Sequence, residues 1–503
     1  MDLKRKLARL GGVGPGSKPG ARPSPAPESP EAEASVVPVA DVPPSLTEAS
    51  PSPVEASPSP IGASPSPAEA PPSPVEAPPA AEPRKELGSR VVALRRLLGD
   101  WAERQDAAVA RRGPSAAPRP GPLPAEARTT PHGVVHVAER LLPSDHHHGN
   151  APLAEALEVE PPLVASLALQ PGLAGVDFQR MLFLDTETTG LAGGTGTVPF
   201  LVGLAWFEGR SLRVHQLFLR KLGEEAPMLR VLAERMAESS CLVTFNGKSF
   251  DWPLLRTRFV LNRVAPPVEL PHLDLLHCAR RVFKYRGSGT RLVHLEEQVL
   301  GYHRVGDVDG SLIPDLYFRF LRGADGSALT PVLEHNANDL LLLAALLGVL
   351  VRRFRANGAE GKDPRDLLGF AGVALRARDY ERAHAFARAA AAGDEGAVGV
   401  EALALASRLS RRAGDDATAA ENLQRALASA RADQAAPLHL ALAKLYEHDL
   451  KDLPRALHHA RLAAPAESPD ALRRRIERLE RKLSRVTREY TLDFGAARPR
   501  TGA

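Results

Sequence analysis

The stretch MLFLDTETTG, Met181–Gly190, decides the fold. Four apolar residues run directly into Asp185, Thr186 and Glu187, and the run ends at a glycine. A short apolar run bounded by a turn residue predicts a buried strand. Because side chains alternate along a strand, Asp185 and Glu187 face the same side. Two such carboxylates repel each other unless a cation lies between them, and Mg²⁺ and Mn²⁺ are hard cations that carboxylates bind. Taken alone, a solvated acidic turn is the simpler explanation.

The segments that follow this strand predict a mixed α/β sheet. VPFLVGLAWFEG and SLRVHQLFLR are two strand-like runs separated by Gly209 and Arg210, and they predict an antiparallel hairpin. After the hairpin we expect a helix over 224–239, a buried strand over 241–245, a helix through 259, and a strand in VELPHLDLL. This order of elements is typical of a mixed sheet with helices packed on it.

Polar residues gather where the second buried strand passes into a helix, in LVTFNGKSFD (242–251). In open α/β sheets, ligands bind at the carboxyl ends of the strands. Asn246 and Lys248 are candidates for binding phosphate or for capping the turn. Asp251 is a candidate metal ligand, or a first-turn acid that the helix dipole favours. Asp274, in HLDLL, is assigned a packing or capping role and kept as a reserve candidate.

A strongly apolar helix is predicted over 334–354, EHNANDLLLLAALLGVLVRRF. His335 and Asp339 are four residues apart and therefore share one face of it. A carboxylate and an imidazole at the edge of a buried helix need polar partners. The two alternatives are a catalytic pair and a cap beside a satisfied core histidine.

Together, LDTETTG, FNGKSFD and HNANDLL, in that order, resemble the three motifs of DEDD-type exonucleases, which have a ribonuclease H-like fold. GLAGGTGTVPFLVGLAWF, FNGKSFDWPLL and HN-x-x-D resemble the bacterial YprB-type family within that superfamily. The resemblance covers roughly residues 130–355. It implies a metal-dependent 3′–5′ exonuclease.

Carried over position by position, the resemblance makes Asp185, Glu187, Asp251 and Asp339 the ligands of two Mg²⁺ or Mn²⁺ ions. Such ions clamp the scissile phosphate about 4 Å apart and activate water. The resemblance makes His335 the general base, although His stands four residues before the last Asp, a spacing that the tyrosine subclass uses, rather than five. The substrate would lie against further residues, namely Thr188, Gly190, Leu191, Asn246 and Lys248.

The composition argues against secreted disulfide-rich proteins and membrane proteins. The chain has 503 residues, 44% of them hydrophobic, so more than one folded unit is expected. Two cysteines, Cys241 and Cys278, argue against a disulfide framework and favour the cytoplasm. No signal peptide and no membrane span are expected. The net charge of +4 is compatible with nucleic acid as a partner.

The 46 prolines are unevenly placed and help to mark the domains. Residues 1–84 are predicted to be a disordered Pro/Ala/Ser-rich tail. Residues 85–130 are predicted to contain an amphipathic helix and a linker. The ribonuclease H-like domain is expected over 131–355, and helical repeats over 364–490.

Two polar clusters have alternative explanations. The consecutive histidines His146, His147 and His148 favour a loop over a metal site. A basic run interleaved with Phe283 and Tyr285 suits single-strand binding or a solvated helix face equally well, and its cations are Arg280, Arg281, Lys284, Arg286 and Arg291.

The last third of the chain has a repeated helical pattern. Asp379, Asp416 and Asp452 each precede an alanine by four, and they lie 37 and 36 residues apart. That period resembles tetratricopeptide repeats, which implies an all-α solenoid that recruits a protein partner. A basic helix after Pro469 is expected to cap it.

The sequence as a whole predicts a nuclease that acts on the 3′ end of single-stranded nucleic acid. A scaffold that binds without cutting, and an endonuclease acting on structured or hybrid substrates, are the alternatives.

Overall fold

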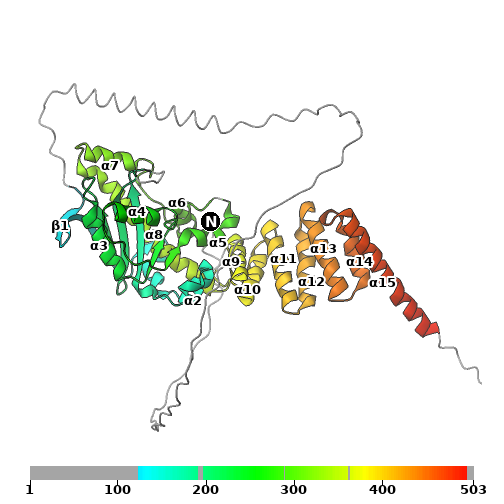
Figure 1. The fold of residues 1–503 in the computed structure, drawn as a ribbon. Helices are drawn as coiled ribbons and strands as arrows, with labels where there is room; N and C mark the ends of the chain where they lie inside the picture. Colours follow the sequence, from blue (N-terminus) through cyan, green and yellow to red (C-terminus); the bar gives the residue numbers. More distant parts are fainter. Residues whose placement is uncertain (1–122, 191–195, 288, 361–362, 496–503) are drawn as a thin grey trace, which may run out of the picture. The chain divides into compact units, whose positions relative to one another are not determined.

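The computed structural model describes residues 123–190, 196–287, 289–360 and 363–495 (Figure 1). All of them belong to one compact unit, Ala110–Ala503. The predicted proline-rich tail, the helix and linker predicted over 85–130, apart from residues 123–130, and Leu191 lie outside the described residues. Within the described part of the chain, no helix is both long enough and apolar enough to cross a membrane.

A seven-stranded mixed sheet, in the order β1-β2-β7-β6-β5-β8-β9, forms the first part of the described chain. β5, β8 and β9 pair in parallel, and the other neighbours pair antiparallel. The mixed α/β class and the β6–β7 hairpin are therefore confirmed. The strands are β1 (Glu126–Thr130), β2 (Gly133–Leu142), β5 (Met181–Thr188), β6 (Pro199–Glu208), β7 (Ser211–Phe218), β8 (Cys241–Thr244) and β9 (His272–Asp274). β1 precedes residue 131, where the sequence placed the start of this domain.

The interior strand β5 is apolar on both faces because a hydrophobic core lies on each side of the sheet. Met181 and Phe183 point into one core, whereas Leu182 and Leu184 point into the other. Asp185 and Glu187 continue the first of these two faces and pair with Gly203 and Leu201 of β6. The expectation that both carboxylates share one side is confirmed by this register.

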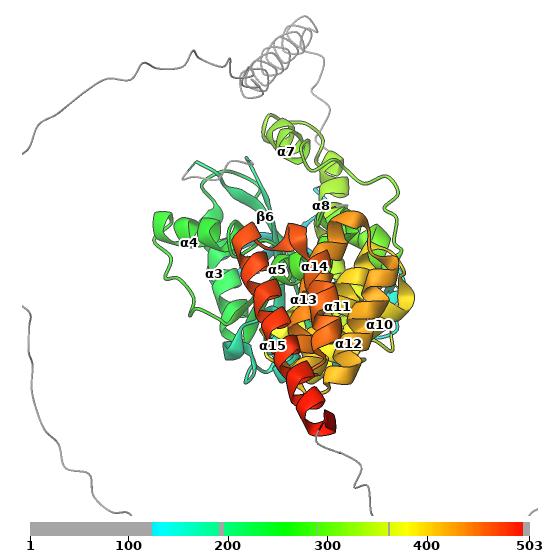
Figure 2. The same ribbon diagram turned by 90° about the vertical axis from the view of Figure 1, so that its right-hand side faces the viewer.

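Helices pack on both faces of the sheet (Figures 1 and 2). The helix expected over 224–239 is α3, and the apolar helix expected over 334–354 is the inner part of the 26-residue α8. α8 contributes Leu340, Leu343 and Leu347 to the same core as Phe183. The main helices are α2 (Pro161–Ala168), α3 (Glu225–Ala237), α4 (Asp251–Leu261), α5 (Leu275–Val282), α6 (Leu292–Leu295), α7 (Ile313–Leu321) and α8 (Thr330–Arg355). Short helical turns are η1 (Leu153–Glu158), η2 (Pro171–Leu173), η3 (Phe178–Arg180), η4 (Lys284–Arg286), η5 (Glu296–Leu300) and η6 (Gly326–Leu329).

The C-terminal region is entirely helical, as predicted, and its consecutive helices pack against one another (Figure 2). These helices are α9 (Pro364–Arg376), α10 (Tyr380–Gly393), α11 (Ala397–Arg412), α12 (Asp416–Ser429), α13 (Ala432–His448), α14 (Leu453–Leu462) and α15 (Pro469–Gly495), with η7 (Ala464–Ala466) before the last.

Every second helix of this region begins at an aspartate. Asp379, Asp415 and Asp452 each accept a hydrogen bond from the backbone N–H three residues later, which satisfies a free amide of the first turn. The expected Asp416 is wrong by one residue, because Asp415 is the cap and the buried alanine four residues on is Ala419. The assignment to tetratricopeptide repeats stays a prediction.

Candidate metal centre

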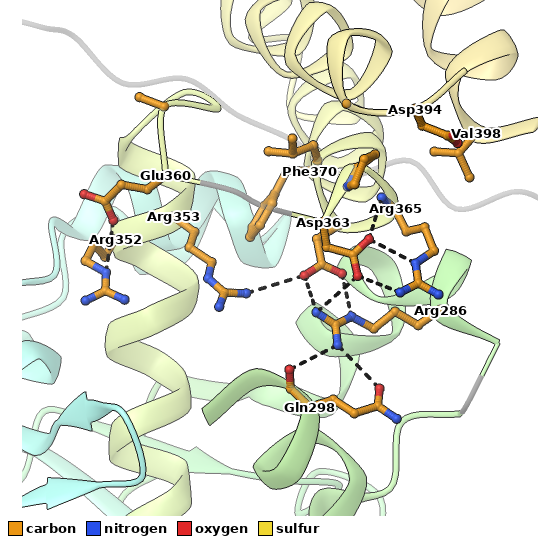
Figure 3. Close-up of a pocket in the computed structure, with 15 residues that line it drawn as sticks. Arg286, Gln298, Arg352, Arg353, Glu360, Asp363, Arg365, Phe370, Asp394 and Val398 are labelled. Atoms are coloured by element: carbon orange, nitrogen blue, oxygen red, sulfur yellow. Dashed lines mark hydrogen bonds and ion pairs between the residues drawn. The ribbon is translucent and has the colours of Figure 1, made fainter. Parts of the chain in front are cut away.

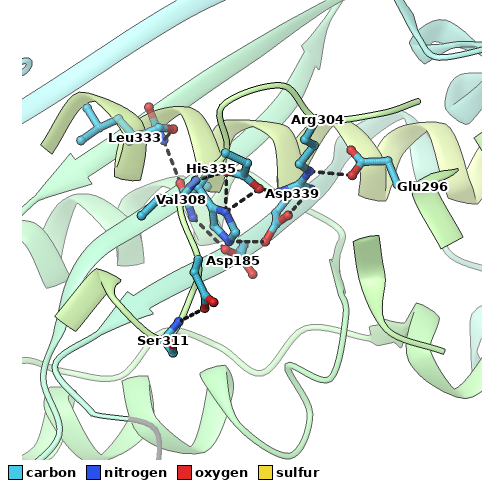
Figure 4. Close-up of polar contacts among 12 residues, drawn as sticks. Asp185, Glu296, Arg304, Val308, Ser311, Leu333, His335 and Asp339 are labelled. Atoms are coloured by element: carbon cyan, nitrogen blue, oxygen red, sulfur yellow. Dashed lines mark hydrogen bonds and ion pairs between the residues drawn. The ribbon is translucent and has the colours of Figure 1, made fainter. Parts of the chain in front are cut away.

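The candidate acids come from three elements that meet at the carboxyl ends of the parallel strands. Asp185 and Glu187 lie at the end of β5, and Asp251 is the first residue of α4, directly after the β8 loop. His335 and Asp339 lie one turn apart near the start of α8, which crosses this edge (Figure 4). Residues more than 150 positions apart in the chain are thereby brought together.

Glu187, His335 and Asp339 form the tightest group. One ligand atom from each lies within 4.8 Å of the others, a spacing that a single metal ion can bridge. Nε2 of His335 is 3.7 Å from Oδ2 of Asp339. The imidazole therefore faces the acids, as the catalytic alternative requires.

Asp185 and Asp251 interact electrostatically with this group. Burial, followed by repulsion from Asp339 and Asp251, raises the pKa of Asp185 well above its usual value. Burial and then Asp185 raise the pKa of Glu187 in the same way. Burial also raises the pKa of Asp251 to about 6, although a hydrogen bond from the Thr186 hydroxyl opposes this shift.

This arrangement of donors fits hard divalent cations. Burial raises the pKa of Asp339 as well, although Arg304 and His335 counteract part of the effect. Four carboxyl groups in one partly dehydrated place are costly to ionise together without added positive charge. Oxygen donors of this kind are the preferred ligands of Mg²⁺ and Mn²⁺. Glu187, Asp339, Asp185 and Asp251 are thus the residues that would hold such ions.

Two buried amides fix the position of Asp185. Nδ2 of Asn336 donates to Oδ2 of Asp185 at 2.8 Å, while its Oδ1 accepts from Nε2 of Gln216 at 2.9 Å. Gln216 also donates to the carbonyl of Leu333 on α8. The chain of contacts links β7, α8 and β5. It requires Gly203 on β6, because a Cβ there would collide with the Asn336 amide.

A buried arginine holds the other side of the centre. The Arg304 guanidinium is 4% exposed and bonds Glu296 at 2.6 Å, Asp307 at 3.1 Å and Asp339 (Figure 4). Although burial opposes its charge, Asp339 and Glu296 raise the pKa of Arg304 above its usual value. Arg304 therefore supplies one fixed positive charge against the acids.

One histidine of the cluster His146, His147 and His148 helps to hold the residues around Arg304 in place. His147 and His148 form a two-residue strand, β3, paired with β4 (Ala151–Pro152), in place of the expected loop. His148 is buried and bonds Glu296, the same carboxylate that holds Arg304. The cluster thus has a structural role through His148.

Asp307 orients His335. Nδ1 of His335 lies 2.9 and 3.0 Å from the two carboxylate oxygens of Asp307. Burial disfavours the Asp307 charge, yet the hydrogen bond from His335 and the contact with Arg304 lower its pKa overall. With Nδ1 donating to Asp307, Nε2 is the nitrogen left to accept a proton on the side of the acids.

The β8–α4 loop is built around Asp274. Oδ1 and Oδ2 of Asp274 accept from the backbone N–H groups of Asn246 and Lys248, and Oδ1 also caps α5 through Leu276. Asp274 therefore has the capping role assigned to it. Asn246 adopts a left-handed backbone (φ 67°), and the Lys248 ammonium bonds the Gln170 side chain at 3.0 Å.

The residues after β5 form a tight turn. The Thr188 hydroxyl is buried and donates to the carbonyl of Gly190 at 2.9 Å. A break in the β5–β6 register between Glu187 and Thr188 precedes this turn. Thr188 thus shapes the backbone beside Glu187.

The basic run that begins in the last turn of α5 does not form one surface. Phe283 is buried, and Arg286 lies over its ring. Arg286 also makes two hydrogen bonds to Asp366 of α9, at 2.7 and 2.6 Å. The Tyr285 hydroxyl donates to Glu401 of α11. Neither sequence interpretation applies to Arg286 or Phe283, because both residues pack against the helical region.

Sequence reasoning missed four residues that shape the centre, namely Arg304, Asp307, Asn336 and Gln216. Asn336 stands inside the HNANDLL motif, so its neighbours were a signal. Arg304 and Asp307 lie in a loop without periodicity, and Gln216 has the appearance of an ordinary alternating strand residue. Only the fold reveals these three.

Comparison with known proteins agrees with this geometry. Residues 182–351 match a family described as RNase_H superfamily. Over 218 residues the chain is 38% identical to the uncharacterized protein YprB of Bacillus subtilis (strain 168), covering 42% of this chain and 51% of YprB. The chain thus spans about half the length of that relative. Residues 182–351 of this chain thus match the ribonuclease H superfamily, and the chain is similar to YprB.

Proposed function

We propose that this protein is a metal-dependent nuclease that shortens single-stranded nucleic acid from its 3′ end. The observation that carries the proposal is the convergence of Asp185, Glu187, Asp251 and Asp339 on one partly buried place, with raised pKa values. Such a group is unfavourable for stability alone, so a role in binding cations accounts for it.

The chain's own residues divide the work of hydrolysis. His335, held by Asp307 through Nδ1, presents Nε2 to the acid group and takes the proton of an attacking water. Asn336 holds Asp185, and Arg304 holds Asp339, so that the carboxylates keep their positions. Bound Mg²⁺ or Mn²⁺, two ions in this proposal, would polarise the scissile phosphate and stabilise its developing charge.

Thr188, Gly190, Leu191, Asn246 and Lys248 complete the proposal as the residues that position the terminal nucleotide. Residues 131–355 are proposed as the catalytic domain, and 364–490 as a tetratricopeptide-like module for a protein partner. The regular Asp caps of α10, α12 and α14 support a repeated helix pair in that module.

The test uses the full chain with 3′- and 5′-labelled single-stranded DNA and RNA, in Mn²⁺, Mg²⁺ or EDTA. Wild type is compared with Asp185→Ala and with Asp315→Ala, which removes an exposed acid of α7. We expect metal-dependent shortening from the 3′ end that is lost only in Asp185→Ala. Internal cuts would show that the protein is an endonuclease and not an exonuclease. Binding without cleavage in every metal would favour the scaffold.

A further inference from the structure

Two hollows lie where the sheet domain meets the first helices of the C-terminal region, and their charges differ. The larger, about 970 Å³, contains arginines that all face carboxylates (Figure 3). Arg286 and Arg353 face Asp366, Arg352 faces Glu155 and Glu360, and Arg365 faces Asp363. The charges around this hollow therefore balance. Its ion pairs hold the sheet domain and the helical region together.

The second hollow, about 590 Å³, is a basic groove between the end of α5 and the helices α9 and α11. Its cations are Arg280, Arg281, Lys284, Arg376 and Arg408. Throughout the ranges 123–190, 196–287, 289–360 and 363–495, none of these five forms an ion pair with a carboxylate. Arg281 and Arg376 bond only backbone carbonyls, and Lys284 lies over the Tyr285 ring.

The acid present in the groove does not neutralise these cations. Glu401 is the carboxylate among its lining residues, and it accepts a hydrogen bond from the Tyr285 hydroxyl. Arg280, Lys284, Arg376 and Arg408 are exposed, so their charges face the solvent side of the groove. Five cations against one acid create a local positive field inside a concave surface, which attracts polyanions.

The floor of the groove is apolar. Leu368 and Leu405 line the groove and are buried, and Tyr285 and Leu375 line it and are half-buried. A single nucleic-acid strand carries phosphates on one side and flat, weakly polar bases on the other. Cations beside an apolar surface match this chemistry. An acidic protein segment matches it less well, because its residues do not each carry both an anionic and an apolar group.

The groove is connected to the metal centre by one short helix. α5 begins at Asp274, which holds the loop leading to Asp251, and its last turn carries Arg280 and Arg281. Eight helical residues span roughly 12 Å. Arg280 and Arg281 therefore lie about the length of α5 from the loop that leads to Asp251.

We propose that the basic groove formed by Arg280, Arg281, Lys284, Arg376 and Arg408 binds the sugar–phosphate backbone of single-stranded nucleic acid, outside the metal centre. The proposal rests on the proposed nuclease function and names a second contact for its substrate. The groove raises affinity for long strands and takes no part in cleavage.

The test measures binding of a fluorescent 30-nucleotide strand, oligo-dT or oligo-U, to the full chain in EDTA at several NaCl concentrations. The groove variant is Arg280→Ala/Lys284→Ala/Arg408→Ala. The control variant, Arg230→Ala/Arg256→Ala/Arg322→Ala, removes the same charge from exposed positions elsewhere. We expect at least a tenfold weaker Kd for the groove variant only. The slope of log K against log salt should fall by about 2, since each phosphate contact contributes about 0.7 on single strands.

A second measurement separates this proposal from the nuclease proposal. The p-nitrophenyl phosphodiester of thymidine is too small to reach the groove, so we expect wild type and groove variant to hydrolyse it equally, while KM for the long strand rises in the variant. If neither substrate is cut, the nuclease proposal fails. The binding measurement then still shows whether the groove binds single-stranded nucleic acid. Equal Kd and equal salt slope in wild type and groove variant would overturn the groove proposal. Competition by poly-glutamate as effective as that by the oligonucleotide would also overturn it.

Discussion

His335 and Asp307 form a hydrogen-bonded pair whose free nitrogen faces the acids. We predict that Asp307→Asn lowers kcat about tenfold or more and leaves KM nearly unchanged, because His335 keeps its place but its Nδ1 then faces an amide that can donate as well as accept, so the tautomer with the proton on Nδ1 is no longer selected. His335→Ala should cost about 10²-fold or more, as expected for loss of a general base. Single-turnover cleavage of a 5′-labelled strand measures both.

Asp309→Asn is the matched control, since Asp309 lies two residues away in the same loop and its hydrogen bonds go to the backbone and side chain of Ser311. Equal loss in Asp307→Asn and Asp309→Asn would mean that the loop as a whole, and not the pairing with His335, controls the rate.

At the scale of the strand, Gly203 keeps β6 close enough to α8 for Asn336 to reach Asp185. We predict that Gly203→Ala lowers the free energy of unfolding by about 1–3 kcal/mol, because the added methyl overpacks a buried site. Affinity for Mn²⁺ should fall as well, since Asp185 loses its support. Urea unfolding and calorimetric titration measure the two effects.

Gly175→Ala is the control, because a Cβ there would meet no atom within 4 Å. A Gly203→Ala protein as stable as wild type, with unchanged Mn²⁺ affinity, would show that Asn336 has room to move.

At the scale of helix packing, Glu447 of α13 is buried and bonds Arg478 and Lys482 of α15 at 2.7 and 2.8 Å. The hydrogen bonds from Arg478, and then from Lys482, lower its pKa to about 2 although burial opposes this. The folded carboxyl thus binds its proton more weakly than the unfolded one. Its stabilisation, up to about 3 kcal/mol, is present above pH 4.5 and lost as pH falls toward 2.

We therefore predict that Glu447→Gln lowers Tm at pH 7 and that the difference from wild type shrinks between pH 4.5 and 2.5. Glu480→Gln, which removes an exposed partner of Arg461, should change Tm little at either pH. Circular dichroism melts measure both. A difference for Glu447→Gln that stays constant with pH would contradict the assigned ion pairs.

At the scale of the whole molecule, the ion pair between Arg286 and Asp366 joins the sheet domain to the helical region. Both side chains are mostly buried, with 10% and 5% exposed. We predict that Arg286→Ala lowers the free energy of unfolding by about 2–4 kcal/mol, because the buried Asp366 loses both short hydrogen bonds and keeps the longer, 3.4 Å contact with Arg353. Arg365→Ala, at an exposed pair with Asp363, should cost at most about 1 kcal/mol.

Scanning calorimetry checks this prediction and also reports coupling between the two regions. If the junction couples them, Arg286→Ala should separate one melting transition into two. Similar effects of Arg286→Ala and Arg365→Ala would argue that the buried pair contributes no more than a surface contact.

The sequence predicted the sheet and the hairpin because local periodicity and strand ends determine these features, whereas the grouping of Asp251 and Asp339 with the β5 acids was implied by the resemblance to exonuclease motifs. Asp185 and Glu187 were placed on one side by alternation alone, and the register with β6 confirms it. The sequence placed the repeated aspartate of α12 at Asp416 instead of Asp415. The two residues are adjacent, and only the backbone geometry shows which of them caps the helix.

Long-range pairing explains the features that the sequence did not predict. Arg286 appeared as a member of a basic surface, but its partner Asp366 is 80 residues away. Arg304 and Asp307 lie in a loop whose position beside α8 is set by tertiary packing. The balance of charge around each cation therefore required the fold.

The most direct test of the central claim is calorimetric titration of Mn²⁺ into the full chain at fixed pH, with Glu187→Gln and Glu208→Gln compared with wild type. Glu187 supplies a ligand atom to the tightest group, and Glu208 is an exposed acid at the end of β6. We predict that Mn²⁺ binds wild type and Glu208→Gln alike and at least about tenfold more weakly to Glu187→Gln. Equal Mn²⁺ affinity in all three proteins would contradict the assignment of a metal centre to these acids.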